Sequence, residues 1–269
     1  MENPAPGFDP VTLSNLKDRG LKKEGLFVGE GRFTVERMLS SGWNIKALLC
    51  TSRWEQQFAE QTRGKCPVHV LSDEAIEKVA GFPFHRGVLA IGERPEFPAL
   101  EKTIGTEDLP PRLIFCPEIN DQENLGSIIR SAAAFGWAVL LGPRTGDPLS
   151  RRVIKVSVGT VFSVPFYTVE DEIRGINLLN SRGYKTCAAV IDRNAGILKN
   201  AGKSGKTALV FGCEAEGLQK KIVEECSQSV RIPIIEEIDS LNVGVAAGIF
   251  LYHFSVDEKG NFYYIRHNG

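Results

Sequence analysis

The sequence has no long hydrophobic run and no excess of one charge, and each absence argues against a class of protein. Its longest apolar stretches, such as residues 243–252, are about half the length that a membrane-spanning helix needs. Lysine and arginine number 32 against 33 aspartate and glutamate residues, which leaves a net charge of −1. This balance argues mildly against a nucleic-acid binder, although a local basic patch is compatible with it.

Cysteine and histidine are sparse and scattered. The six cysteines form no close pair in the sequence, and the four histidines show no metal-ligand spacing. We therefore expect no metal and no disulfide framework, and most cysteines should be small buried apolar residues. The first residues lack a basic segment followed by an apolar core, so we expect no signal peptide, no membrane association and a cytoplasmic protein.

The composition is that of an ordinary globular protein, and short apolar runs alternate with amphipathic stretches, which is typical of an α/β fold. In the first half, strands are expected at 26–28, 45–50, 68–70 and 88–91, with helices at 34–41, 54–62 and 73–79. A proline- and glycine-containing stretch then predicts a linker. We expect a small α/β domain over residues 1–95, a linker over 96–111 and a larger α/β domain over 112–269.

A capped helix is predicted from residue 124 onwards. Its apolar positions have helical spacing, Asn124 stands where an N-cap residue is expected, and Gly136 stands where a helix-ending glycine is expected. Arg130 then lies on a different face from the apolar stripe. Taken alone, this pattern favours an ordinary amphipathic helix with a solvated arginine.

A second segment runs from a buried strand at 208–211 into a glycine-containing turn. Glycines there allow backbone N–H groups to approach a ligand, and Glu214 follows the strand end, where α/β proteins bind ligands. An ordinary connection between a strand and a helix explains this segment at least as well.

A third segment predicts a helix over residues 241–254 whose first turns consist of small residues. Asp239 or Ser240 is placed to cap it, and Gly244, Ala247 and Gly248 allow close packing against neighbouring backbone. A tightly packed core helix accounts for the pattern, and spacing alone assigns no chemistry to Ser240 or Asn242.

Together, the three segments resemble the motifs of the SpoU family, which are TrmH-like RNA ribose 2′-O-methyltransferases of the SPOUT class. Residues 124–130 have the pattern Asn-x-Gly-x-x-x-Arg, residues 211–218 read Phe-Gly-x-Glu-x-x-Gly-Leu, and residues 240–246 read Ser-Leu-Asn-Val-x-Val-Ala. Residues 159–165 resemble the segment between the first two motifs. The match runs from residue 112 to about 255, and the first half is similar, through weaker cues, to the family's N-terminal substrate-binding domain.

The resemblance implies a trefoil-knotted C-terminal domain that binds S-adenosyl-L-methionine, acts on rRNA or tRNA and forms a homodimer. It places the cofactor beside Gly212, Gly217, Ile232 and Leu241. It assigns the chemistry to Asn124, Arg130, Glu214, Ser240 and Asn242. For Arg130 the roles of base and phosphate clamp both stay open, and the clamp is favoured because a guanidinium has a pKa above about 12.

Some positions depart from the family pattern and bear on specificity rather than on the reaction class. Gly244 stands where the family usually has serine, Ile234 where it often has methionine, and the pair His85 and Arg86 precedes Gly87 where glutamine is commoner.

Two alternative functions stay open. One is a catalytically inactive RNA-binding homologue of the same fold. The other is a flavodoxin-like nucleotide enzyme, which is disfavoured because no phosphate-binding glycine motif is complete.

The remaining expectations concern partners. RNA should contact a local basic surface, for which the candidates are Arg32, Arg37, Arg86, Arg144, Arg151, Arg152 and Lys155. The terminal helix is apolar on almost every side, so we expect a second copy of the chain to cover it. A tail at 261–265 that folds back over the helix is the competing explanation.

Overall fold

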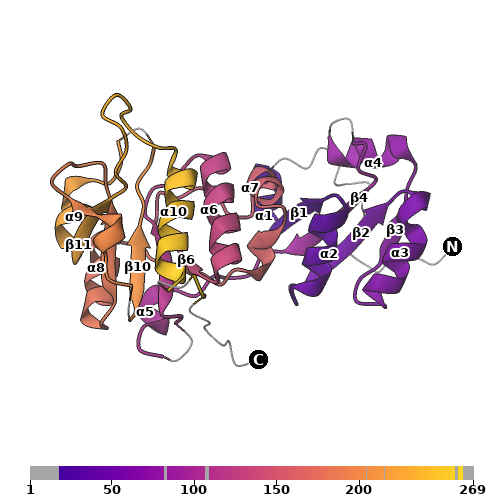
Figure 1. Cartoon of the computed structure of the whole chain (residues 1–269). Helices are drawn as coiled ribbons and strands as arrows, with labels where there is room; N and C mark the ends of the chain where they lie inside the picture. Colours follow the sequence, from indigo (N-terminus) through magenta and orange to yellow (C-terminus); the bar gives the residue numbers. More distant parts are fainter. Residues whose placement is uncertain are drawn as a thin grey trace. The chain divides into compact units, whose positions relative to one another are not determined.

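The computed structural model describes residues 18–81, 84–106, 109–203, 205–214, 216–257 and 260–262 (Figure 1). The chain forms two compact units. The first contains Met1–Glu96 and Pro148–Ser163, and the second contains Phe97–Asp147 and Val164–Gly269. Strands and helices alternate in both units, so the predicted α/β class is confirmed. The knot that the resemblance implies stays a prediction.

The first unit is built on a four-stranded sheet with the order β1-β4-β2-β3. Strand β4 is antiparallel to both of its neighbours, and β2 is parallel to β3. The strands are β1 (Leu26–Glu30), β2 (Ile45–Cys50), β3 (Val68–Val70) and β4 (Val88–Glu93). Helices α1 (Asp18–Lys23) and α4 (Asp73–Ala80) share one core cluster with β1, β2 and β4. Two further helices, α2 (Arg32–Ser40) and α3 (Ser52–Thr62), follow β1 and β2 along the chain.

Helix α7 (Arg151–Val156) and the short helix η1 (Thr160–Ser163) belong to the first unit, although they lie within the range expected to form the second domain. The Phe162 ring lies 5.5 Å from the Phe27 ring and 5.3 Å from the Trp43 ring. This aromatic contact buries Phe162, and it explains why the segment packs with β1.

The second unit contains a seven-stranded sheet with the order β7-β6-β5-β10-β8-β11-β9, and every neighbouring pair is parallel. Its central strands are apolar at nearly every position, because helices cover both faces of a parallel sheet. The strands are β5 (Arg112–Cys116), β6 (Ala138–Leu141), β7 (Phe166–Thr168), β8 (Lys185–Ala189), β9 (Gly196–Ile197), β10 (Thr207–Val210) and β11 (Gln228–Arg231).

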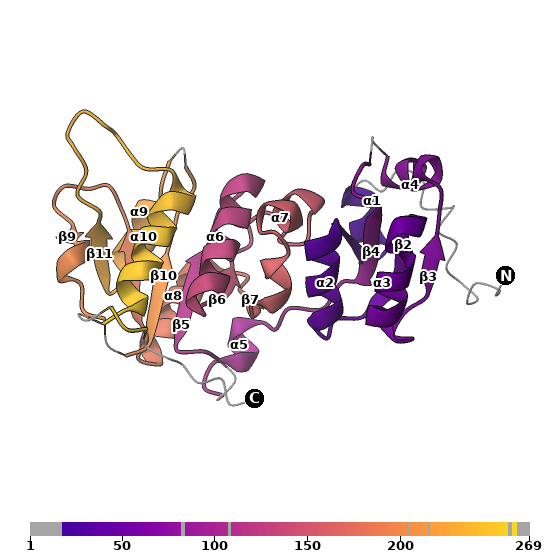
Figure 2. The ribbon, with the colours of Figure 1, turned by 45° about the vertical axis from the view of Figure 1, so that its right-hand side comes forward.

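Helices α6 (Gln122–Phe135) and α10 (Val243–Ser255) run side by side over one face of this sheet (Figures 1 and 2). A side chain at Gly244 would place its Cβ 2.9 Å from the hydroxyl oxygen of Ser127. The predicted close packing at Gly244 is therefore confirmed, and the nearest neighbour is a serine side chain rather than backbone.

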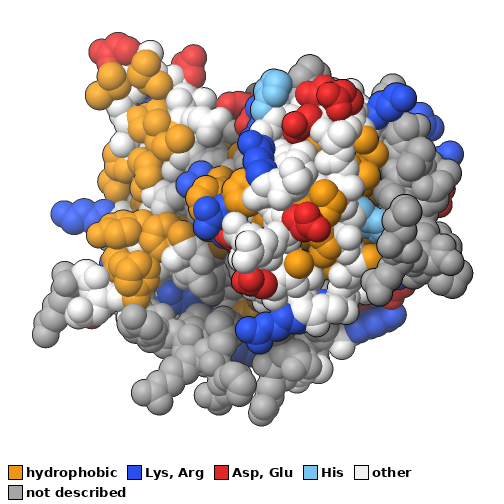
Figure 3. All heavy atoms as spheres, turned by 90° about the vertical axis from the view of Figure 1, so that its right-hand side faces the viewer, with side chains coloured by type: hydrophobic (Ala, Val, Ile, Leu, Met, Phe, Trp, Pro, Cys, Tyr) orange, Lys and Arg blue, Asp and Glu red, His pale blue; other side chains and the backbone are white. Residues whose placement is uncertain are grey.

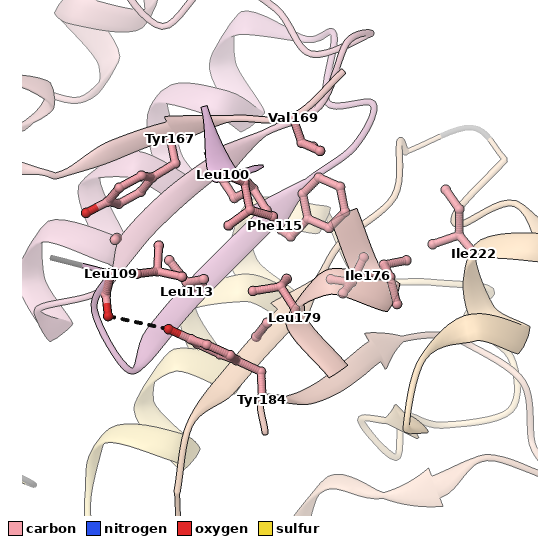
Figure 4. Packing of buried hydrophobic residues seen from close by; sticks show 14 residues of the cluster. Leu100, Leu109, Leu113, Phe115, Tyr167, Val169, Ile176, Leu179, Tyr184 and Ile222 are labelled. Carbon is pink, nitrogen blue, oxygen red and sulfur yellow. Dashed lines mark hydrogen bonds between the residues drawn. The ribbon is translucent and has the colours of Figure 1, made fainter. Parts of the chain in front are cut away.

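The opposite face is covered by α5 (Leu100–Thr103), α8 (Glu172–Ser181) and α9 (Lys220–Glu225), which share the core cluster shown in Figure 4. Leu100 and Leu109 are buried in this cluster, although they lie within the range predicted as a linker. The Tyr184 hydroxyl donates to the carbonyl of Pro110 over 2.7 Å. Burial raises the pKa of Tyr184 to about 12, so the hydroxyl keeps its proton and remains a donor. Leu100, Leu109 and Pro110 are thereby anchored to the second unit.

Four of the six cysteines are buried and all six are free thiols, which confirms the prediction that most act as small apolar residues. Burial raises the pKa of Cys116 to about 12. None of the helices in the described part of the chain combines the length and the apolar character that crossing a bilayer requires.

Candidate active site

The three sequence motifs meet at one edge of the seven-stranded sheet. Asn124 lies in the first turn of α6, after β5; Glu214 lies in the loop after β10; and Asn242 precedes α10, after β11. Because all of these strands are parallel, their carboxyl ends point to the same edge, where open α/β sheets bind ligands. The segments are far apart in sequence, and the topology brings them together.

Asn124, Glu214 and Asn242 form a closed ring of hydrogen bonds. The Nδ2 of Asn124 donates to Oε2 of Glu214 over 3.0 Å. The Nδ2 of Asn242 donates to Oδ1 of Asn124 over 2.7 Å and to Oε1 of Glu214 over 3.2 Å. Both carboxylate oxygens of Glu214 therefore accept a side-chain amide, and each of the three loops is tied to the other two. This ring of three side chains is called the amide–carboxylate ring.

Both helix starts at this edge are capped by residues other than the expected ones. Asp121, not Asn124, caps α6 by accepting a bond from the backbone N–H of Asn124 over 2.8 Å. Asn242, not Asp239 or Ser240, caps α10 through its Oδ1. The predicted caps were wrong because each helix starts at a different residue: α6 begins two residues earlier, and α10 begins after Asn242. Gly136 ends α6 in the left-handed conformation, as predicted.

Gly212 and Gly217 are needed for the shape of the loop after β10. A Cβ at Gly212 would lie 2.2 Å from the carbonyl carbon of Gly217, because the chain folds back on itself. The Gly217 N–H donates to the carbonyl of Cys213 over 2.9 Å, and Gly217 has a φ of +68°. The sequence predicts that these glycines let a ligand approach the backbone, whereas the contact that excludes a side chain at Gly212 is with the loop's own backbone.

Arg130 stands apart from the amide–carboxylate ring. It lies on α6, six residues after Asn124, and is therefore turned by about 120° around the helix axis. Its side chain is exposed, and within the described residues it makes no ion pair or hydrogen bond. The guanidinium is therefore free to bind an external anion.

The remaining predicted residues lie in or just before the loop between β11 and α10. Ile232 and Leu241 are half-buried, and Ser240 is exposed. No hydrogen bond of the described residues connects Ser240 to the amide–carboxylate ring. The structure thus brings together Asn124, Glu214 and Asn242, and among the described residues Arg130 and the Ser240 hydroxyl have no protein partner.

A second polar network at this end of the sheet was not found from the sequence. Arg144, after β6, lies 3.1 Å from Oε2 of Glu118 and 2.9 Å from Oε1 of the buried Glu172. Gln219 donates to Glu118 over 3.2 Å. The hydrogen bond from Arg144 lowers the pKa of Glu118, and Glu118 in turn raises the pKa of Arg144. The residues of this network come after different strands in the sequence. Their spacing is not that of any known motif, so the sequence alone does not identify them.

The basic residues proposed for RNA have different environments. Arg144 is held by the two carboxylates described above, and Arg151 forms a mostly buried ion pair with Glu30. Arg37 donates to the carbonyl of Val158. Arg32 and Arg86 are exposed. Arg32 pairs with Glu36, and Arg86 donates to the carbonyl of Glu30. All five of these cations thus have partners within their own unit, but only Arg32, Arg37, Arg86 and Arg144 are exposed.

The sequence model of the SpoU rRNA Methylase family matches residues 111–252, which is more than half of the chain. The model of the MRM3-like substrate binding domain matches residues 11–90. The methylase match covers most of the second unit together with Pro148–Ser163 of the first, and the substrate-binding match lies within the first unit.

Curated relatives and solved structures agree with these matches. An uncharacterized tRNA/rRNA methyltransferase of Mycobacterium bovis is 33% identical over 85% of this chain and 80% of its own length. The 23S rRNA (guanosine-2′-O-)-methyltransferase RlmB of Acinetobacter baylyi is 34% identical over 69% of this chain and 76% of its own length. The AdoMet-bound rRNA methyltransferase from Sinorhizobium meliloti superimposes with a TM-score of 0.75 at 25% identity, over 91% of this chain and 92% of that one. On these matches, the chain belongs to the SpoU rRNA Methylase family.

Proposed function

We propose that this protein transfers a methyl group from S-adenosylmethionine to a ribose 2′-hydroxyl of structured rRNA or tRNA. The observation that carries the proposal is the amide–carboxylate ring, which joins the three motif loops at the ligand-binding edge of a parallel sheet. The ribose as target is supported by relatives such as RlmB of Acinetobacter baylyi, which is named a guanosine-2′-O-methyltransferase.

The loops at this edge fit S-adenosylmethionine. Gly212 and Gly217 form a compact turn, and Ile232 and Leu241 contribute half-buried apolar side chains in the neighbouring loop. Backbone groups of such loops suit the polar parts of the cofactor, and apolar side chains suit an adenine ring. When bound, the cofactor supplies an electrophilic methyl group, so the protein has to orient the ribose and assist in removing one proton.

Arg130 is the residue that we assign to the nucleotide. A guanidinium with a pKa above about 12 is a poor base, but it binds a phosphate through two parallel hydrogen bonds. Its positive charge beside the ribose would lower the pKa of the 2′-hydroxyl and favour the attacking alkoxide. The absence of any protein partner for Arg130 in the described structure supports this role.

The ring residues act as positioning residues in this proposal. The Asn242 amide hydrogens are both used within the ring, and its oxygen accepts the N–H groups of Gly244 and Val245. Asn242 has therefore little capacity left to bind a nucleotide. Ser240 keeps a free, exposed hydroxyl, and we assign to it a hydrogen bond to the RNA.

The decisive experiment is the methylation of total RNA with labelled S-adenosylmethionine, followed by mapping of the labelled nucleotide. The label should lie on a ribose, and a substrate with a 2′-deoxy nucleotide at that position should bind without being methylated. Label on a base would contradict the ribose assignment. Cofactor binding by calorimetry without any methylated RNA would favour the inactive RNA-binding homologue.

We also propose a homodimer formed through the face shared by α6 and α10. On α10, Ala247, Phe250, Leu251 and Phe254 are buried in the unit's own core. Val245, Ile249 and Tyr252 remain 55%, 39% and 56% exposed on the other side. The tail at 261–265, which is the competing cover for α10, lies mostly outside the described residues. Of its two described residues, Phe262 contacts Phe135, and the centres of the two rings are 6.1 Å apart. Three large apolar side chains on one helix face favour a second copy as their cover.

A further inference from the structure

Beyond the methyl-transfer site, the first unit exposes an aromatic side chain among arginines. Phe33, in the first turn of α2, has 66% of its surface exposed to solvent. On the face of this unit seen in Figure 3, basic and acidic side chains are interspersed among uncharged ones, so positive charge on this face is local. An exposed aromatic ring with adjacent cations is the pattern by which proteins hold single-stranded nucleic acid.

The topology of the small sheet explains why this cluster forms. Glu30 at the end of β1 pairs with Leu89, and Cys50 at the end of β2 pairs with Val88. The carboxyl ends of β1 and β2 therefore meet the beginning of β4 at one edge. Helices α2 and α3 start from this edge, and in the described structure neither N-cap residue, Gly31 or Thr51, bonds the first N–H groups through a side chain. Two uncapped helix starts add donors and partial positive charge to the arginines.

The aromatic and basic side chains of this edge contact one another. The guanidinium carbon of Arg32 lies 5.6 Å from the Phe33 ring centre and 6.0 Å from that of Trp54. Arg53 lies 5.6 Å from the Trp54 ring centre. The indole N–H of Trp54 donates to the carbonyl of Arg86 over 3.1 Å, which joins the loop before β4 to α3. We call Arg32, Phe33, Arg53, Trp54 and Arg86 the Phe33 cluster.

Backbone carbonyls hold two of these arginines in place. Arg53 donates to the carbonyl of His85 over 2.7 Å, and Arg86 donates to that of Glu30 over 3.2 Å. Their other guanidinium N–H groups remain available to a ligand, because a guanidinium has five. Two carboxylates lie near these arginines. Arg32 donates to the carboxylate of Glu36 over 2.8 Å, and the exposed Glu55 lies in the first turn of α3. Three arginines against two carboxylates leave the surface positively charged.

We propose that the Phe33 cluster binds an unpaired nucleotide of the RNA substrate, with its base stacked on Phe33 and its neighbouring phosphates held by Arg53 and Arg86. This inference rests on the proposed RNA methyltransferase function, and it assigns to the first unit the recognition of a single-stranded feature. Unpaired bases offer a face for stacking, whereas bases within an A-form helix do not. A paired helix would meet the arginines through phosphate alone.

The test uses the full-length protein and a short single-stranded RNA that carries 2-aminopurine, whose fluorescence is quenched when the base stacks. The wild type should bind this strand more tightly than the same strand in a duplex, and it should quench the probe. Phe33→Ala and Phe33→Leu should each lose about tenfold in affinity together with the quenching, whereas Phe33→Trp should keep both. Arg53→Ala should weaken binding, and Lys65→Ala, an exposed position beyond the opposite end of α3, should not.

The results separate this inference from the proposed function. Normal S-adenosylmethionine binding and methylation of total RNA by the wild type, together with unchanged probe affinity of Phe33→Ala, would overturn the Phe33 cluster alone. A Phe33→Leu variant that binds and quenches the strand like the wild type would overturn the stacked base, because leucine has no ring on which a base stacks. A wild type that binds cofactor but methylates no RNA would overturn the proposed function. In that case, retained quenching would still support the nucleotide site.

Discussion

The side-chain amide of Asn242 donates a 2.7 Å hydrogen bond to the side-chain oxygen of Asn124, which lies 118 residues earlier in the chain. The same Asn242 side chain caps α10 through its oxygen. One amide group therefore fixes the start of α10 and also ties it to the loops after β5 and β10. This double use makes Asn242 a point where stability of the helix and geometry of the site are coupled.

Substitutions at Asn242 separate these two roles. Asn242→Asp keeps an oxygen that can cap α10 but removes the amide hydrogens and places a second carboxylate beside Glu214. Asn242→Ala removes both roles and should lower the free energy of unfolding by about 1 kcal/mol through the lost cap. Both variants should bind S-adenosylmethionine more weakly, because the loops are no longer tied together.

The two variants differ in their pH dependence. In Asn242→Asp, the new carboxylate and that of Glu214 repel each other, which raises the pKa of the pair in the folded variant. The loss of unfolding free energy is therefore largest at pH above this raised pKa. It becomes smaller as pH falls towards the unfolded carboxyl pKa of about 4. Thermal unfolding across this pH range should show Asn242→Asp approaching the wild type in acid, while Asn242→Ala keeps a constant deficit. Parallel pH profiles for the two variants would contradict the like-charge explanation.

Arg130→Ala should abolish most methyl transfer without harming the fold. Arg130 is exposed and has no described protein partner, so the melting temperature and the cofactor affinity should not change. The rate should fall by about two orders of magnitude or more, as expected when a transition-state contact is lost. Arg130→Lys should fail too, since an ammonium does not reproduce the planar fork of a guanidinium. Arg174→Ala, an exposed arginine on α8, is the matched control and should remain active.

Sequence patterns predicted most of the strands and the three motif segments, because each of these signals is local. Strands β2 (Ile45–Cys50) and β3 (Val68–Val70), for example, have the predicted bounds. The amide–carboxylate ring could be expected only from the family resemblance, since its members are 28 to 118 residues apart. The pairing of Arg144 with Glu118 and Glu172 has no local signal at all, because it depends on which strands become neighbours.

The packing of Leu100 and Leu109 shows a different limit of sequence reading. Prolines and glycines around them predict a linker, but both leucines are buried against the second unit. Isolated apolar residues in an irregular segment have no periodicity to detect, so only the tertiary structure reveals their partners.

The glycines of the loop after β10 should differ in their tolerance of substitution. Gly212→Ala would force a Cβ to within 2.2 Å of backbone atoms, so the loop has to rearrange and cofactor binding should be lost. Gly217 has no atom within 4 Å of its Cβ position, but its φ is +68°. Gly217→Asn should therefore be mild, since asparagine adopts the left-handed conformation more readily than other residues. Calorimetric titration of both variants with S-adenosylmethionine tests this order, and equal affinities would contradict it.

The ion pair between Glu118 and Arg144 predicts a stability change in acid. The hydrogen bond from Arg144 lowers the pKa of Glu118 below its ordinary value of 4.5. A carboxyl with a lowered folded pKa stabilises the fold at pH above its unfolded pKa, and this contribution disappears as pH falls through the folded pKa. The melting temperature of the wild type should therefore exceed that of Glu118→Gln at neutral pH, and the difference should shrink as pH falls below 4.5. High salt should reduce the difference, because Arg144 is 40% exposed.

The exposed face of α10 predicts the oligomeric state. One face of this helix exposes three large apolar side chains to solvent, those of Val245, Ile249 and Tyr252, and the opposite face is buried in the core. An exposed apolar patch of this kind is typical of a protein–protein interface. Light scattering should show a dimer for the wild type and a monomer for Ile249→Lys, since burying a lysine in an apolar interface without a partner is unfavourable. Val70→Lys, on the exposed end of β3 in the first unit, adds the same charge to an exposed apolar position and should leave the dimer intact. A wild-type monomer that methylates RNA at nanomolar concentration would contradict the dimer. A dimeric Ile249→Lys would place the interface elsewhere on the protein.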